Sequence, residues 1–123
     1  MRAQQILFVE DDALVGMSTG DFMRGQGIRV LDAHSAATAM TVVDRKGYLS
    51  ALVTDIELGA GQDGFDIARQ ARALYPNLPV VFVSGTAAAR HAAEGVEGSV
   101  FIRKPYHPRQ ILDALAGLRF GRA

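Results

Sequence analysis

Short apolar runs alternate with longer amphipathic stretches along the chain. Most of these runs lack polar alternation, which is typical of strands covered on both faces of a parallel sheet. The second run is shorter and contains more polar residues than the others, as expected for a strand at a sheet edge. The pattern predicts five strands, at residues 5–9, 28–33, 51–55, 80–83 and 99–103.

The stretches between the runs have the spacing and the end signals of helices. Asp12, Ser35 and Asp63 stand where capping residues are expected, and Pro108 suits the first turn of a last helix. We therefore predict helices from Asp12 to the glycines at 25–27, and over 36–45, 64–75, 86–94 and 108–118.

Apolar side chains mark the inner faces expected for these helices. The first helix has its apolar positions at Leu14, Val15, Met17, Phe22 and Met23. The third has Phe65, Ile67, Ala68, Ala71 and Leu74. The alanine-rich stretch at 86–94 has few large apolar anchors, so we expect this helix to be the least firmly packed.

Strands that alternate with helices imply right-handed crossovers and a sheet covered on both faces. We expect an α/β, flavodoxin-like, doubly wound fold, in which a five-stranded parallel sheet of order 2-1-3-4-5 is packed with five helices. In such folds the ligand site lies at the carboxyl ends of the strands, here between the first and third.

Length and charge narrow the class of protein. A chain of 123 residues fits one domain, so residues 1–123 are expected to form a single unit. The 13 basic and 13 acidic side chains balance, which gives no footprint for nucleic acid or an anionic membrane. Without cysteine there is neither a disulfide nor a thiolate metal site. With no signal peptide or spanning segment in view, the expected location is cytoplasmic.

Polar residues stand at the tips of four predicted strands. Because parallel strands end at the same edge, these tips are expected to meet. The residues are Glu10 and Asp11 after the first strand, Asp55 after the third, Ser84 after the fourth and Lys104 after the fifth.

Such an acidic cluster requires a positive partner. Two carboxylates about 5 Å apart repel by roughly 3 kcal/mol at an effective dielectric constant near 20. Hard oxygen ligands favour Mg²⁺ over zinc. Together with Mg²⁺, the Ser84 hydroxyl and the Lys104 ammonium could hold a phosphoryl group, with Asp55 as the attacking carboxylate.

These residues resemble the receiver domain of two-component response regulators, the CheY-like family, over essentially the whole chain. The markers are Glu10-Asp11, Asp55, Ser84-Gly85 and Lys104-Pro105, in the family's order. The resemblance implies that Asp55 accepts a phosphoryl group from a phosphohistidine on a histidine kinase or phosphotransfer protein. It also implies output to an unknown downstream protein through the fourth helix, fifth strand and fifth helix.

The resemblance also assigns roles to single residues. It implies Mg²⁺ ligation by Asp11, Asp55 and the Glu57 main-chain carbonyl, with Glu10 acting through water. It implies that Ser84 and Phe101 form the switch. Lys104 would pair with a phosphate oxygen and precede a cis peptide bond to Pro105.

The loop after Asp55 departs from the family pattern. Gly59 takes the position at which members commonly carry proline, and Asp63-Gly64 arrives one residue late. We expect the loop at 59–62 to be more flexible than usual, which bears on the carbonyl geometry at the metal and on the lifetime of the phosphate.

Other functions compete with a stand-alone phosphoacceptor. One alternative is a protein-binding module of the same fold whose contacts ignore phosphorylation. A haloacid-dehalogenase type of phosphatase would need a cap and more chain, so we expect no enzyme turnover. A flavodoxin would need hydroxyls and amides after the first strand, where this chain has acids. No output domain fits after Gly121, so a role in transcription would require a partner.

The three histidines, His34, His91 and His107, fall on different predicted elements. We expect them to face solvent without a metal or catalytic role.

Overall fold

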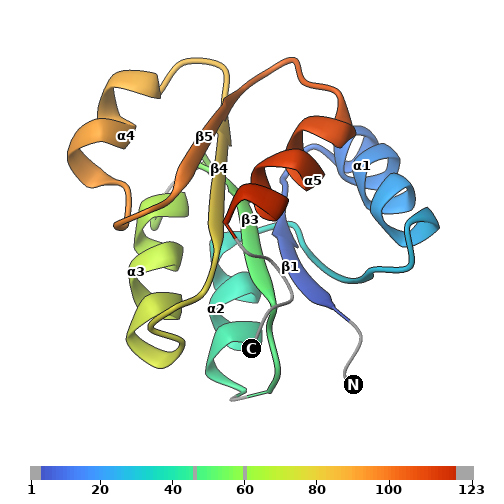
Figure 1. Ribbon diagram of the computed structural model, residues 1–123. Helices are drawn as coiled ribbons and strands as arrows, with labels where there is room; N and C mark the ends of the chain where they lie inside the picture. Colours follow the sequence, from blue (N-terminus) through green and yellow to red (C-terminus); the bar gives the residue numbers. More distant parts are fainter. Residues whose placement is uncertain (1–3, 46, 60, 119–123) are drawn as a thin grey trace.

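Five parallel strands form one sheet in the order β2-β1-β3-β4-β5, with helices on both of its faces (Figure 1). The computed structural model describes residues 4–45, 47–59 and 61–118. The strands are β1 (Gln5–Val9), β2 (Arg29–Ala33), β3 (Ala51–Asp55), β4 (Val80–Ser84) and β5 (Val100–Arg103). The helices are α1 (Ala13–Gly25), α2 (Ala36–Asp44), α3 (Gly64–Leu74), α4 (Ala88–Glu94) and α5 (Pro108–Gly117). The predicted fold and strand order are confirmed.

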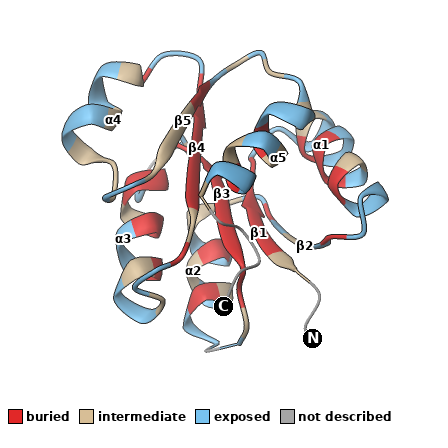
Figure 2. Ribbon diagram, viewed as in Figure 1, coloured by how far each residue is buried: buried red, intermediate tan, exposed pale blue. Residues whose placement is uncertain are grey.

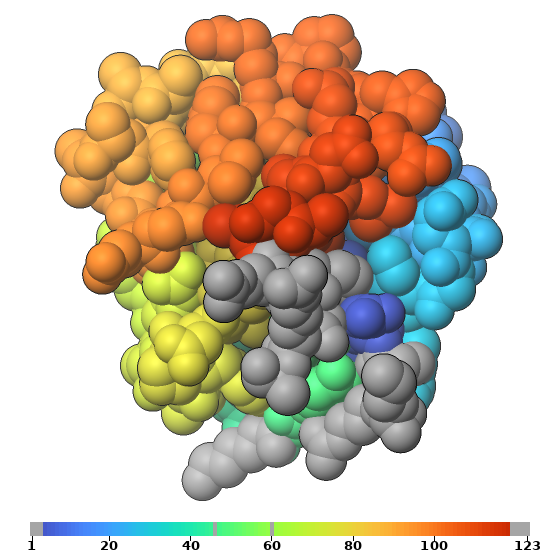
Figure 3. Space-filling view, viewed as in Figure 1, coloured from blue at the N-terminus to red at the C-terminus, as the bar shows by residue number. Residues whose placement is uncertain are grey.

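The helices divide the core into two layers. Helices α2 and α3 cover one face of the sheet, and α1 and α5 cover the other. Strands β3 and β4 are buried over their full length (Figure 2), as their unbroken apolar runs predict. On the viewed face α5 lies across the sheet between α1 and the segment that contains α4 and β5 (Figure 3).

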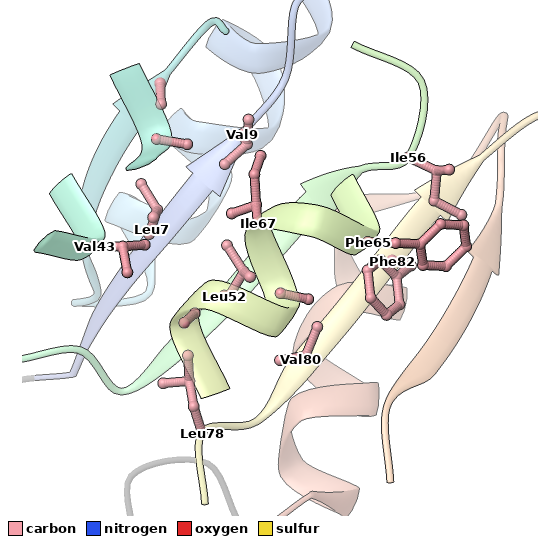
Figure 4. Packing of buried hydrophobic residues seen from close by; sticks show 14 of the residues in the cluster. Leu7, Val9, Val43, Leu52, Ile56, Phe65, Ile67, Leu78, Val80 and Phe82 are labelled. Atoms are coloured by element: carbon pink, nitrogen blue, oxygen red, sulfur yellow. The ribbon is translucent and has the colours of Figure 1, made fainter. Parts of the chain in front are cut away.

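The layer under α2 and α3 fixes the third and fourth strands. Leu52 and Val80 of the sheet pack in one cluster with Ile67 of α3 (Figure 4). The rings of Phe65 and Phe82 lie 4.9 Å apart and close the layer near the carboxyl ends of the strands. This packing places the end of β3, and with it Asp55, in a rigid frame.

The predicted helix caps at Asp12, Ser35 and Asp63 are confirmed. The Asp12 carboxylate accepts hydrogen bonds from the amides of Leu14 and Val15. Asp63 forms a reciprocal capping box with Asp66, which sets where α3 begins.

The predicted inner faces are wrong at three positions. Leu14 and Met17 of α1 are 78% and 63% exposed, and Leu74 of α3 is 43% exposed. The buried residues of α1 are instead mostly small: Gly16, Thr19, Gly20 and Met23. A Cβ at Gly16 would lie in ordinary van der Waals contact with Glu10, 3.6 Å from its Cγ, so this face of α1 packs against the residue that follows β1.

Helix α4 is the least anchored element, as predicted, although it begins two residues later than expected. It has seven residues, no side-chain cap and no buried residue. Among the described residues, two of its own side chains, Arg90 and His91, attach it to the rest of the molecule, and Arg69 of α3 donates to the Glu94 carbonyl at 3.3 Å. Arg90 pairs with Asp63 at 2.9 Å, and its guanidinium lies 5.1 Å from the centre of the Phe65 ring.

His91 is the second attachment, which corrects the prediction that it faces solvent. Its ring lies 5.6 Å from that of Phe82 and 5.8 Å from that of Phe101, and its Nε2 is 2.9 Å from Ser99 Oγ. The histidine therefore occupies the place of the large apolar anchor that the alanine-rich sequence lacks. His34 is exposed, as predicted, and the exposed His107 caps α5.

None of the helices within 4–45, 47–59 and 61–118 combines the length and the apolar character needed to cross a membrane.

Candidate functional site

Three carboxylates meet at the carboxyl ends of β1 and β3, as the sequence predicts. One oxygen from each of Glu10, Asp11 and Asp55 lies within 4.8 Å of the others. Glu10 and Asp55 are buried, whereas Asp11 is exposed at the mouth of the site. An all-oxygen donor set of this size fits a hard divalent cation with open positions for water or phosphate oxygen.

Lys104 lies against the two buried carboxylates. Its Nζ is 2.8 Å from Asp55 Oδ1 and 3.0 Å from Glu10 Oε1. The Lys104 amide donates to the Ser84 carbonyl, which fixes the backbone at the end of β5, and the bond to Pro105 is cis, as the resemblance implied. The ammonium thus offsets part of the repulsion within the acidic pair.

The buried acids have displaced pKa values. Burial, reinforced by the neighbouring Glu10 and opposed by Lys104, raises the pKa of Asp55 to about 8. Burial also acts to raise the pKa of Glu10, but hydrogen bonds with Asp55, Lys104 and the Asp12 amide lower it overall. Burial acts to lower the pKa of Lys104, and its two acidic partners more than reverse this. Without metal, the Asp55–Glu10 pair is therefore expected to hold one proton between its two carboxyl groups at neutral pH.

We expect binding of a divalent cation by this cluster, tested with Mg²⁺, to depend steeply on pH. A carboxyl group must lose its proton to bind the metal, so each pH unit below about 8 should weaken binding close to tenfold. Calorimetric titration at pH 6, 7 and 8 should show an affinity loss of about 50- to 100-fold from pH 8 to pH 6. At pH 7 about one proton should leave per ion bound. An affinity that is constant over this range would contradict the protonation state of Asp55.

Ser84 is buried near the site, but its hydroxyl does not point at Asp55. It donates to Glu57 Oε1 at 2.7 Å and accepts from the amides of Thr86 and Ala87. Within the described chain no hydrogen bond joins the Ser84 hydroxyl to Asp55 or to the Lys104 ammonium. The hydroxyl is held by residues of the loops after β3 and β4, and its predicted role as a donor to a phosphoryl group on Asp55 stays a prediction.

Two of the predicted roles are not tested by this geometry. Phe101 is half-buried against the layer that contains Phe82, so it is packed as expected, and its role as a switch stays a prediction. Metal ligation by the Glu57 main-chain carbonyl also stays a prediction. In the loop that follows, Gly59 and Gly61 adopt positive φ angles of 85° and 96°, while Ala60 lies outside the described residues.

Sequence reasoning missed an apolar groove beside the site. The groove has a volume of about 500 Å³ and lies between α1 and the segment after β5. It is lined by Leu14, Val15, Ser18, Thr19, Lys104, Pro105, Tyr106 and Pro108. The Tyr106 hydroxyl lies 3.0 Å from Thr19 Oγ1, which joins the two walls. The groove shows itself only in the structure, through the exposure of Leu14, because the apolar pattern of the sequence predicts that this side chain is buried.

A family model described as the response regulator receiver domain matches residues 6–116. The chain belongs to the response regulator receiver domain family. This receiver domain is similar to a receiver protein of Sinorhizobium medicae whose crystal structure shares 32% identity with it, at a TM-score of 0.91. The alignment covers 95% of this chain and 94% of that one.

Curated relatives of this receiver domain are longer proteins. It is 29% identical to the response regulator protein FleR of Pseudomonas aeruginosa, over 93% of this chain and 24% of FleR. It is 26% identical to the transcriptional regulatory protein YbdJ of Bacillus subtilis, over 91% of this chain and 49% of YbdJ. The receiver domain thus spans a half or less of these relatives, some of which carry further domains.

Proposed function

We propose that this receiver domain takes a phosphoryl group from a phosphohistidine onto Asp55. An Asp55 oxygen bonds to phosphorus as the P–N bond breaks, and the leaving imidazole nitrogen keeps the electron pair of that bond. The product is an acyl phosphate on Asp55, so the domain is consumed as the acceptor in the transfer and does not turn over as an enzyme. The observation that carries the proposal is the convergence of two further carboxylates and one ammonium on Asp55.

Each neighbour of Asp55 has a part in the proposal. Lys104 already lies 2.8 Å from an Asp55 oxygen, and it would pair with the phosphoryl oxygens as negative charge moves there. Glu10 and Asp11 would hold Mg²⁺ together with Asp55. When bound, Mg²⁺ would neutralise charge on the transferred group and favour the ionised form of Asp55.

The apolar groove supplies a docking place for the donor protein. A donor must bring its phosphohistidine to the mouth at Asp11, and the groove opens beside that mouth because Lys104 lines both. A helix of the donor that carries apolar side chains would bury the exposed Leu14 there. We therefore assign the face formed by α1 and the segment after β5 to the phosphohistidine donor.

We expect Leu14→Asp to slow phosphotransfer from a phosphohistidine donor protein about tenfold or more, because a charge would enter an apolar contact. Leu74→Asp is the matched control, since Leu74 is an exposed leucine on α3, across the sheet. Labelling by acetyl phosphate needs no protein docking and should stay within about twofold in both variants. Equal rates of phosphotransfer from the donor protein to Leu14→Asp and to Leu74→Asp would contradict docking on the face formed by α1 and the segment after β5.

Labelling with acetyl phosphate and Mg²⁺ tests the proposed function. Mass spectrometry of the intact protein should show the gain of one phosphoryl group, and peptide mapping should place it on Asp55. The label should be released by hydroxylamine, because an acyl phosphate is attacked at its carbonyl carbon. A label that resists hydroxylamine, or that maps to another residue, would refute the assignment.

A further inference from the structure

The Ser84 hydroxyl has its whole hydrogen-bonding capacity in use. A serine hydroxyl has one hydrogen to donate and two lone pairs to accept with. Its hydrogen goes to Glu57 Oε1 at 2.7 Å, and the amides of Thr86 and Ala87 donate to it at 3.0 Å each. No second donor is left for a group on Asp55 while this arrangement lasts.

The two partners differ in their surroundings. Ser84 is 1% exposed, so water cannot easily replace a lost partner, whereas Glu57 is an exposed residue. A carboxylate is a stronger acceptor than a neutral oxygen, which makes the bond from Ser84 to Glu57 the firmest of the three. Glu57 also follows Asp55 by two residues, so the acceptor that holds the hydroxyl comes from the same loop as the phosphoryl site.

We propose that Glu57 is a positioning residue that holds the Ser84 hydroxyl away from Asp55 and competes with the phosphoryl group for its hydrogen. The inference rests on the proposed function, because it takes Asp55 as the site of the phosphoryl group. Ser84 donates to a phosphoryl oxygen only after the bond to Glu57 breaks. Glu57 therefore weakens the phosphorylated arrangement relative to the free one, and its removal favours that arrangement.

A simple repulsion between the Glu57 carboxylate and a phosphoryl group would act in the same direction. The two causes differ in their dependence on Ser84. Competition for the hydroxyl hydrogen disappears when residue 84 has no hydroxyl, whereas charge repulsion remains. A double-mutant cycle between the two residues therefore separates them.

The experiment measures the affinity of the full chain for beryllofluoride, a phosphoryl mimic, by calorimetry at saturating Mg²⁺. The variants are Glu57→Ala, Glu57→Gln, Ser84→Ala and the double variant Glu57→Ala/Ser84→Ala, with circular dichroism as the check of folding. We expect Glu57→Ala to bind about tenfold more tightly than the wild type, since a charge-assisted hydrogen bond no longer competes. In the Ser84→Ala background the same change should alter the affinity less than about twofold.

Glu57→Gln keeps a neutral acceptor for the hydroxyl and should fall between wild type and Glu57→Ala. Asp113→Ala, the loss of an exposed acid on α5, is the control for net charge and should bind as the wild type does. The inference is overturned if Glu57→Ala leaves the affinity unchanged, or if it tightens binding equally with and without the Ser84 hydroxyl. Failure of wild-type protein to bind beryllofluoride, or equal binding by Asp55→Asn, would instead overturn the proposed function.

Discussion

The Asp55→Asn variant should take up no phosphoryl group from acetyl phosphate, with labelling below about 1% of the wild-type level. The amide is a poor nucleophile, yet it has nearly the shape of the carboxyl group. Its carbonyl can accept from Lys104 and its NH₂ can donate to Glu10, so it replaces the protonated Asp55 of the metal-free protein with little change in packing. The loss would therefore report on chemistry at this oxygen. Intact mass after incubation with acetyl phosphate and Mg²⁺ measures it.

Urea unfolding of the Asp55→Asn variant tests whether it is folded. The pKa of Asp55 is about 8 in the folded protein and near 3.8 in the unfolded chain, so the folded wild type binds more protons between these values. Wild-type stability then falls as the pH rises through this range, by at most about 1.4 kcal/mol per pH unit. The asparagine side chain does not titrate, so the variant's advantage in urea unfolding with EDTA should grow from pH 5 to pH 8 and then level off. Labelling of Asp55→Asn to the wild-type level would refute the role of Asp55.

Gly64→Ala should lower the free energy of unfolding by about 3 kcal/mol or more, because the added methyl group would clash with the main chain of Asp55 and Ile56. A Cβ at this position would lie 2.1 Å from the Asp55 carbonyl oxygen and 3.0 Å from Ile56 Cα. The Gly64 amide also donates to the Ile56 carbonyl at 2.8 Å, so the first turn of α3 cannot move away without loss of that bond. Urea unfolding at pH 7 measures the change.

Gly25→Ala is the matched control for this substitution. Gly25 ends α1, and an added Cβ there would meet no atom within 4 Å. The change should be neutral or should stabilise the protein by up to about 1 kcal/mol, as expected for alanine in a helix. Similar unfolding free energies for the two variants would contradict the close contact between α3 and the end of β3.

The fold could be predicted because its determinants are local in the sequence. Unbroken apolar runs mark buried parallel strands, and a capping side chain such as Asp12 or Asp63 fixes where a helix begins. The meeting of Glu10, Asp55 and Lys104 followed from these elements without further information, since all parallel strands in one sheet end at the same edge. Chain direction alone brought the charged residues together.

The rest depends on side-chain choices that are settled by tertiary contacts. The Ser84 side chain has several rotamers, and the neighbouring sequence does not decide which one it takes. Its partner Glu57 is 27 residues away along the chain, and Asp55 is slightly farther. The face that α1 buries consists mostly of small residues, among them Gly16 beside Glu10, and apolar periodicity does not encode such a face. The prediction that His91 faces solvent was wrong for a similar reason. Since α4 has no large apolar side chain, the His91 ring anchors this helix against Phe82 and Phe101.

Helix α4 gains little from the core and is tied down chiefly through Arg90 and His91. Substitutions at the other positions of α4 are therefore expected to change the stability of the fold little. Mutations that accumulate along this helix can alter its outer surface over evolutionary time while the chemistry of the acidic residues and lysine is inherited unchanged. The outer surface of α4 and the proposed chemistry at Asp55 can thus diverge separately within one domain.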